Sequence, residues 1–176
     1  RPGPQPATVS VGLTESEARG LNPAASADDY LVASYFESGA RPEGREFARK
    51  VRAKYGADRV ATDAMAAAYT GVHVWARGAA AAGTADPSAV LAKVRGAEFD
   101  APAGRVRVDP ANQHAWLPVR VGKVQASGAV ALVPGAGSER PVPPAPFPPT
   151  RTRDAWAGFL RGLELDWGGK WQAPKP

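Results

Sequence analysis

Apolar residues recur at helical spacing in the segment that begins at Pro42. Phe47, Val51 and Tyr55 stand four residues apart, which places them on one face of a helix. Proline is favoured at the first helical position, and glycine directly after the end of a helix. The pattern therefore predicts a helix that begins at Pro42 and ends at Gly56.

Two further helices are predicted downstream of this one. The first begins at Asp63, which we expect to cap it, and runs for about five turns to Ala82. Its expected apolar stripe consists of Met65, Tyr69, Val72, Ala76 and Ala79. The second begins at Asp86 and Pro87 and ends at Gly96, with three residues expected to be buried, Val90, Leu91 and Val94.

Alternation of apolar and polar residues predicts strands in both halves of the chain. The predicted strands are Thr8–Leu13, Leu31–Phe36, Gly104–Val108, Leu117–Gln125 and Ala129–Val133. A turn at Ser127 and Gly128 is expected to join the last two as a hairpin. Between the first two strands, Thr14 and Glu17 form a capping-box pattern that opens a short helix, ended by Gly20.

Proline dominates the segment from Pro134 to Pro149. Its seven prolines predict an extended connector with little strand pairing. A last helix is predicted from Arg151 to Leu163, and the tail after it carries Trp167 and Trp171.

The order of elements predicts an α/β fold that is incomplete. There are too few strands for the helices that must cover them, and the first strand begins almost at the first residue. A parallel sheet requires neighbouring crossover units. We therefore interpret the chain as a fragment, or as half of a structure that depends on a partner.

The amino-acid composition excludes several kinds of functional site. The chain has no cysteine and two histidines, which excludes disulfides, thiolate metal sites and a cysteine nucleophile. The longest mostly apolar stretch, from Ala64 to Ala82, is interrupted by polar residues and is a poor membrane span. The net charge of +5 is scattered, and no nucleic-acid recognition motif accompanies it. A hydrolase motif of the Gly-x-Ser-x-Gly type is also absent, so we expect neither an enzyme nor a nucleic-acid binder, and no cofactor.

Several segments in a fixed order resemble one known family. They are Lys54–Val60, Thr62–Trp75, Phe99–His114, Pro118–Gly122, Pro148–Arg151 and Trp167–Trp171. In order and spacing these resemble the C-terminal part of type I periplasmic solute-binding proteins of the urea and short-chain amide group. Such proteins serve ABC transporters of the branched-chain amino-acid class. The resemblance covers nearly the whole chain from about Ser10 onward.

The resemblance implies two Rossmann-like lobes joined by hinge strands, with ligand held between them. On that basis residues 1–58 belong to the C-terminal part of lobe two, and residues 59–112 return to lobe one. Residues 113–134 form the hinge and hairpin segment, and residues 135–176 form the proline-rich connector with the C-terminal helix and tail.

Three residues are candidates for ligand contact: Tyr69, Thr14 and Glu15. Thr14 and Glu15 follow the first strand, and ligands of open α/β sheets bind at the carboxyl ends of strands. Tyr69 occupies a position that contacts ligand in related amino-acid binders. Each has a structural alternative: Thr14 as an N-cap alone, Glu15 as a helix-dipole charge, and Tyr69 as a core tyrosine. His114 is interpreted as a structural residue, and the tryptophans as core and tail anchors.

The implied function is substrate binding for an ABC importer of urea or short-chain amides. Its partners are a small polar ligand (urea, a short-chain amide or an amino acid) and the permease subunits. Its location is the periplasm, or the outer face of the cytoplasmic membrane as a lipoprotein. Ala66 stands where many relatives have a glutamate, which bears on urea specificity. A cytoplasmic amide-sensing regulator on the same fold and a branched-chain amino-acid binder remain as alternatives.

Overall fold

The computed structural model describes residues 7–21, 26–39, 41–143 and 153–169. The chain divides into two compact units, Arg1–Pro144 and Ala145–Pro176. The first unit carries the sheet and most of the helices, and the second carries α6 (Arg153–Asp166).

The first unit begins with strand–helix–strand. The strands β1 (Val9–Ser10) and β2 (Tyr30–Ala33) pair in parallel on either side of α1 (Glu15–Gly20) in the sequence. Both predicted strands are thus present but shorter than expected. Because β1 and β2 are parallel, their carboxyl ends lie at the same edge of the sheet.

Three helices follow in the sequence: α3 (Pro42–Tyr55), α4 (Asp63–Ala82) and α5 (Pro87–Val94). Glycines terminate two of these helices, as the sequence predicted. Helix α3 ends at Gly56, and α4 ends at Gly83, which adopts the left-handed conformation. The cap of α4 differs from expectation, because the Thr62 side chain accepts a hydrogen bond from the Met65 amide, and Asp63 is the first helical residue.

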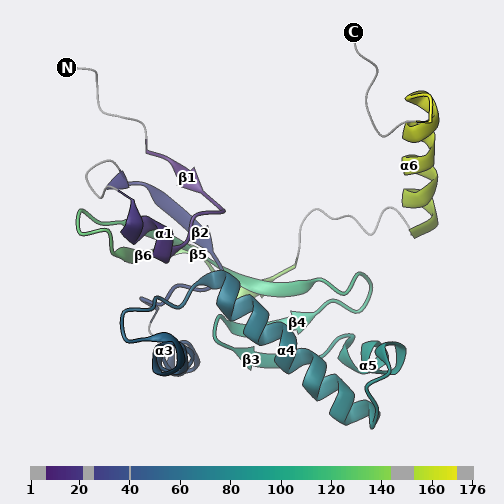
Figure 1. Cartoon of the computed structure of the whole chain (residues 1–176), viewed down its shortest axis with the longest axis horizontal. Helices are drawn as coiled ribbons and strands as arrows, with labels where there is room; N and C mark the ends of the chain where they lie inside the picture. The colour runs from purple at the N-terminus through teal and green to yellow at the C-terminus, as the bar shows by residue number, and fades with distance from the viewer. Residues whose placement is uncertain (1–6, 22–25, 40, 144–152, 170–176) are drawn as a thin grey trace. The chain divides into compact units, whose positions relative to one another are not determined.

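The remaining strands form an antiparallel group. They are β3 (Glu98–Ala101), β4 (Gly104–Val108), β5 (Ala115–Val124) and β6 (Val130–Val142). Within the described residues, the sheet order is β1-β2-β5-β4-β3, with β6 also paired to β5. The long strand β5 therefore joins the parallel pair to the β3–β4 hairpin (Figure 1).

Two features of these strands depart from the sequence prediction. The predicted connector was wrong from Pro134 to Val142, because β6 continues to that residue; glycines at positive φ and shifts in register accommodate the irregular stretch. Gly137 (φ 84°) lies against the backbone of Val119, where a Cβ atom would have no room. The strand β3 was not predicted, since its alternation spans only four residues.

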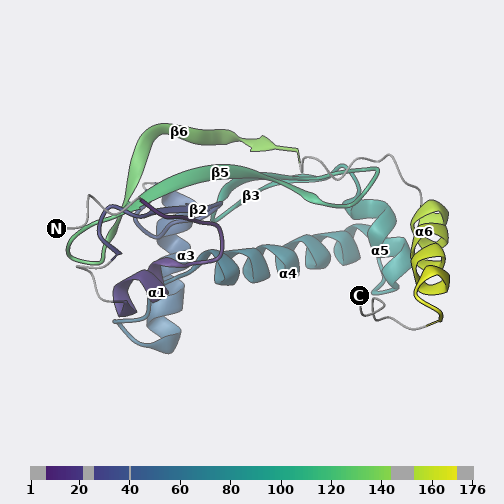
Figure 2. The same cartoon turned by 90° about the horizontal axis from the view of Figure 1, so that it is seen from above.

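Among the residues that the structure describes, the core consists of three apolar clusters. One joins β2, α1 and the β5–β6 hairpin around Leu31 and Val124. A second packs α3 against the first half of α4 around Phe47 and Ala66. The third lies between α4 and the β3–β5 strands around Val106, and Figure 2 shows α4 running along this side of the sheet.

The apolar stripe expected on α4 was partly wrong. Val72 is 67% exposed, and Trp75, expected as a core anchor, is 50% exposed. The buried positions of the helix are the small residues Ala66 and Gly78. A Cβ atom on Gly78 would lie 2.5 Å from Val94 Cγ1, so glycine allows α4 and α5 to approach closely. Tyr55, at the end of α3, is also exposed.

In the second unit, the described residues form the amphipathic helix α6. Trp156 contacts Phe159 edge-to-face, with 5.8 Å between the ring centroids, and both are about 42% exposed. The helix begins at Arg153 and continues three residues beyond the predicted end at Leu163. Trp171 lies outside the described residues. No helix among the described residues is both long enough and apolar enough to cross a membrane.

Candidate ligand-binding site

A cavity of about 190 Å³ lies where β1 and β2 end. Its walls come from the segment after β1, the segment after β2 and the start of α4. The lining residues are Val11, Gly12, Leu13, Thr14, Glu15, Val32, Ala33, Tyr35, Phe36, Asp63 and Ala64. This is the edge at which open α/β sheets hold their ligands.

Thr14 lines this cavity and also caps α1. Its Oγ1 accepts a hydrogen bond from the Glu17 amide at 3.4 Å, while the Glu17 carboxylate accepts one from the Thr14 amide at 2.8 Å. These bonds to Thr14 lower the pKa of Glu17. The predicted capping box is confirmed, and Thr14 is therefore already engaged in holding the helix start.

Glu15 is 4% exposed and fastens the segment after β2. Its Oε2 accepts a hydrogen bond from the Glu37 amide at 2.5 Å. Burial raises the pKa of Glu15, against the opposing effect of the amides of Glu37 and Ser38. A charge that only complemented the helix dipole would lie in solvent, so Glu15 has a tertiary role that its position in the sequence did not reveal.

Asp63 contributes a second carboxylate to the same cavity. Its Oδ1 accepts a hydrogen bond from the Tyr35 amide at 2.8 Å. Burial raises the pKa of Asp63, and the amides of Tyr35 and Ser34 oppose that rise. Sequence reasoning identified Asp63 only as a cap and missed this contact. The one available signal was an acidic residue at the start of a long helix.

Glu37 completes the network that positions this segment. Its side chain is 7% exposed; Oε2 accepts a hydrogen bond from the Ala61 amide at 2.5 Å, and Oε1 pairs with Arg52. Carboxylates from α1, α4 and the segment itself thus hold residues 35–37 in place. The cavity wall is thereby positioned by charged hydrogen bonds as well as by apolar packing.

Tyr69 lies in a different place from Thr14 and Glu15. It is partly buried on the α3–α4 cluster, with its ring centroid 5.1 Å from that of Phe47 and 4.3 Å from that of His73. It lines a separate cavity between α3 and α4. The structure therefore brings two of the three sequence candidates together and separates the third.

The other predicted structural roles can be placed as well. His114 lies at the entry to β5, where its backbone carbonyl accepts a hydrogen bond from the Asp109 amide at 2.8 Å. His73 is exposed. Among the described residues, no group of three or more potential metal ligands occurs.

Comparison with protein families adds a decisive observation. Residues 4–153 match the sequence profile of the periplasmic binding protein domain. The chain belongs to this family. Membership implies a periplasmic location, and the family is one of binding proteins rather than enzymes.

Solved structures of periplasmic binding proteins share the fold. A solute binding protein of an ABC transporter from Rhodopseudomonas palustris BisB5, in complex with 3,4-dihydroxybenzoic acid, matches with a TM-score of 0.64 and 16% identity over 72% of this chain. An ABC transporter substrate-binding protein from Sphaerobacter thermophilus matches with a TM-score of 0.64 and 20% identity over 77% of this chain. The match covers 35% of the first structure and 38% of the second, so the chain spans about a third of their length.

One protein of similar sequence is named as an enzyme rather than as a binding protein. A Geobacillus stearothermophilus protein named limonene hydroxylase is 29% identical over 122 residues, which cover 69% of this chain and 22% of that protein. The name describes that much longer protein, whereas the family match covers most of this chain.

Proposed function

We propose that this chain is part of the substrate-binding component of an ABC importer. In this proposal residues 1–58 belong to one lobe, residues 59–112 return to the other, residues 113–134 form the hinge segment, and residues 135–176 form the C-terminal segment, in which β6 continues to Val142. The ligand is held between the lobes, and the loaded protein delivers it to the permease subunits. The family membership and the cavity at the carboxyl ends of β1 and β2 support this assignment.

The observation that carries the ligand class is the pair of carboxylates in the cavity wall. Glu15 and Asp63 come from different helices, and both line the same small space. Carboxylates accept hydrogen bonds from N–H donors and repel other carboxylates. The cavity thus favours a ligand that presents N–H groups, and urea or a short-chain amide is our first candidate.

An amino acid is the second candidate, since its ammonium group meets the same requirement. Among proteins of similar fold, one from Thermotoga maritima MSB8 is described as a leucine binding protein, with a TM-score of 0.51 and 20% identity. Aromatic acids, which the Rhodopseudomonas proteins hold, fit less well, because their carboxylate would approach two acidic side chains.

Thr14 is proposed as a wall residue whose hydroxyl already accepts the Glu17 amide. Its capping role and a ligand contact are compatible, because a hydroxyl both donates and accepts. The ligand contact expected of Tyr69 stays a prediction, since that residue lines another cavity.

Calorimetric titration of the full-length gene product tests this proposal. Acetamide, urea, leucine and 4-hydroxybenzoate serve as ligands, and we expect an amide or the amino acid to bind best. Asp63→Asn is expected to weaken that binding about tenfold, because a charged hydrogen bond contributes about 1.5 kcal/mol or more. The exposed Asp58→Asn serves as control and leaves the affinity unchanged. Preferential binding of the aromatic acid would contradict the assignment of ligand class.

A further inference from the structure

A second cavity, of about 480 Å³, lies between α3 and the first half of α4. Its size is within the range of small-molecule sites in proteins. It is lined by Phe47, Lys50, Val51, Lys54, Tyr55, Arg59, Met65, Ala68 and Tyr69. None of these residues belongs to the cavity at the ends of β1 and β2, so the two spaces are distinct.

The floor of this cavity is apolar and well anchored. Phe47 and Val51 are at most 7% exposed and belong to the α3–α4 core cluster. Met65 and Tyr69 pack against that cluster from α4. The floor is therefore a fixed surface on which a hydrocarbon chain or ring gains burial at roughly 25 cal/mol per Å².

The rim is positively charged. Lys50 and Lys54 come from α3, and Arg59 from the turn after it. Within the described part of the chain, no ion pair joins Lys54 or Arg59 to a carboxylate, and Lys54 lies 5.5 Å from the ring centroid of Tyr55.

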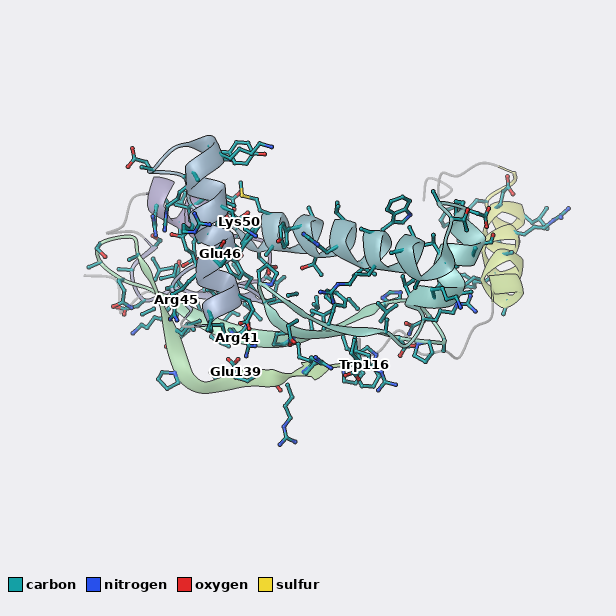
Figure 3. The ribbon with its side chains drawn as sticks, turned by 90° about the horizontal axis from the view of Figure 1, so that it is seen from below. Arg41, Arg45, Glu46, Lys50, Trp116 and Glu139 are labelled. Atoms are coloured by element: carbon teal, nitrogen blue, oxygen red, sulfur yellow. The ribbon has the colours of Figure 1, made fainter. Side chains whose placement is uncertain are left out.

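The carboxylate that pairs with Lys50 is already occupied. Glu46 lies 3.9 Å from Lys50, but its two oxygens accept hydrogen bonds from Arg49, each at 2.7 Å. Figure 3 shows Glu46 and Lys50 on α3. Lys54 and Arg59 are thus available to an anion in the cavity.

We propose that this cavity is a binding site for an amphipathic monocarboxylate. The apolar part of the ligand lies on Phe47, Met65 and Tyr69, and its carboxylate meets Lys54 and Arg59. Charge complementarity selects this class, since an amphipathic cation would meet like charges at the rim. The site is separate from the cavity proposed for the importer ligand, and its ligand class differs from the amide or amino acid expected there.

The chain offers a specific reporter for the test, because Met65 is its only methionine. In protein labelled with ¹³C-methyl methionine, titration with octanoate is expected to shift the Met65 resonance saturably. Octylammonium and 1-octanol share the hydrocarbon tail of octanoate but lack its negative charge. We expect both to bind at least tenfold more weakly, because they lose the attraction between the carboxylate and the two rim cations.

Four variants separate this site from general surface binding. The double change Lys54→Glu and Arg59→Glu is expected to weaken octanoate about tenfold or more, whereas Lys93→Glu, on an exposed position of α5, leaves it unchanged. Ala68→Trp fills the cavity from an exposed helical position and is expected to abolish the shift while all charges remain. Glu15→Gln, in the other cavity, has no effect on octanoate.

The proposal is overturned by any of three results. These are no saturable octanoate shift in the unaltered protein, equal shifts with octylammonium, or undiminished octanoate binding by the double charge variant. Amide or amino-acid binding in the other cavity is measured separately, so either proposal can fail while the other stands.

Discussion

The Asp63 carboxylate accepts a hydrogen bond from the backbone amide of Tyr35, 28 residues earlier in the chain, at 2.8 Å. This bond joins the first residue of α4 to the segment that follows β2. It brings a helix start and a strand end together at one cavity, and Glu15 fastens the same segment from α1 through the Glu37 amide.

The bond between Asp63 and Tyr35 leads to a stability prediction. Asp63→Ala leaves a partly buried amide without an acceptor, and we expect a loss of about 1–3 kcal/mol in the free energy of unfolding. Asp63→Asn keeps an oxygen acceptor and is expected to cost less. Urea unfolding followed by circular dichroism measures both. An alanine variant as stable as the asparagine variant would contradict this account.

The buried Glu15 predicts a pH dependence of stability. Burial raises the pKa of Glu15 above its usual 4.5, so the folded chain binds that proton more tightly than the unfolded chain. Its contribution to stability therefore falls as the pH rises from 4.5 through the raised pKa. Glu15→Gln is expected to flatten this part of the pH profile of Tm, since glutamine keeps an acceptor but does not titrate.

Glu17 is a control for Glu15, because its pKa is shifted in the opposite direction. The bonds to Thr14 lower the pKa of Glu17, so its stabilising effect is present above 4.5 and is lost as the pH falls through its lowered pKa. Glu17→Gln is thus expected to lower Tm at neutral pH more than in acid. If both variants changed the pH profile in the same direction, the assignment of the two shifts would be wrong.

Gly78 predicts a steric limit between α4 and α5. In Gly78→Ala the new Cβ would lie 2.5 Å from Val94 Cγ1 and 2.9 Å from Val90 Cγ1, and we expect a loss of about 1–3 kcal/mol. Gly71→Ala, on the same helix with open space around it, is the matched control. It is expected to be neutral or to gain up to about 1 kcal/mol, because alanine favours helix more than glycine does. Thermal unfolding of the two variants makes the comparison.

The buried Arg120 side chain forms hydrogen bonds to three separate segments of the chain. Its Nη1 donates to the carbonyls of Ser34 and Ala103, while Nε and Nη2 donate to Glu139 at 2.9 and 2.5 Å. Arg120→Met leaves those carbonyls without this donor, and we expect a loss of about 2–4 kcal/mol.

The Glu139 partner is expected to matter much less. Its side chain is 68% exposed, so Glu139→Gln is expected to cost under about 1 kcal/mol. Denaturant unfolding of the two variants compares them. Equal losses would show that the carboxylate, rather than the two carbonyls, accounts for the effect of Arg120.

The chain by itself is predicted not to bind a small amide with useful affinity. Half of a cleft cannot remove water from both sides of the ligand, and the hydrogen bonds it offers then compete with solvent. Calorimetry of this chain with urea, acetamide and leucine is expected to show no binding in the micromolar range. Micromolar affinity would mean that the cavity at β1 and β2 is a sufficient site.

Local signals were enough to identify most of the helices. Pro42 and Gly56 bound α3 as expected, and Thr14 with Glu17 opened α1, because these preferences depend on the backbone conformation of a few adjacent residues. The hairpin at Gly128 was found for the same reason, since its positive φ of 78° is a property of the turn itself.

Contacts between distant segments could not be derived from those signals. The helical spacing that placed Val72 on the buried face of α4 was outweighed by the close approach of α5 at Gly78, which turned a different face inward. The candidate site shows the same division. The sequence placed Thr14 and Glu15 at the end of a strand but left out Asp63, whose partner lies in another element.

The sequence by itself determined where α1, α3 and α4 begin and end, and that two candidate residues follow a strand. Only the tertiary structure decided which side chains share a cavity, and it placed Asp63 beside Glu15 while it separated Tyr69 from both. The physical reason is the distance along the sequence over which each interaction acts. Caps and turns depend on neighbours within about four residues, whereas a cavity depends on the packing of elements that the sequence orders but does not place.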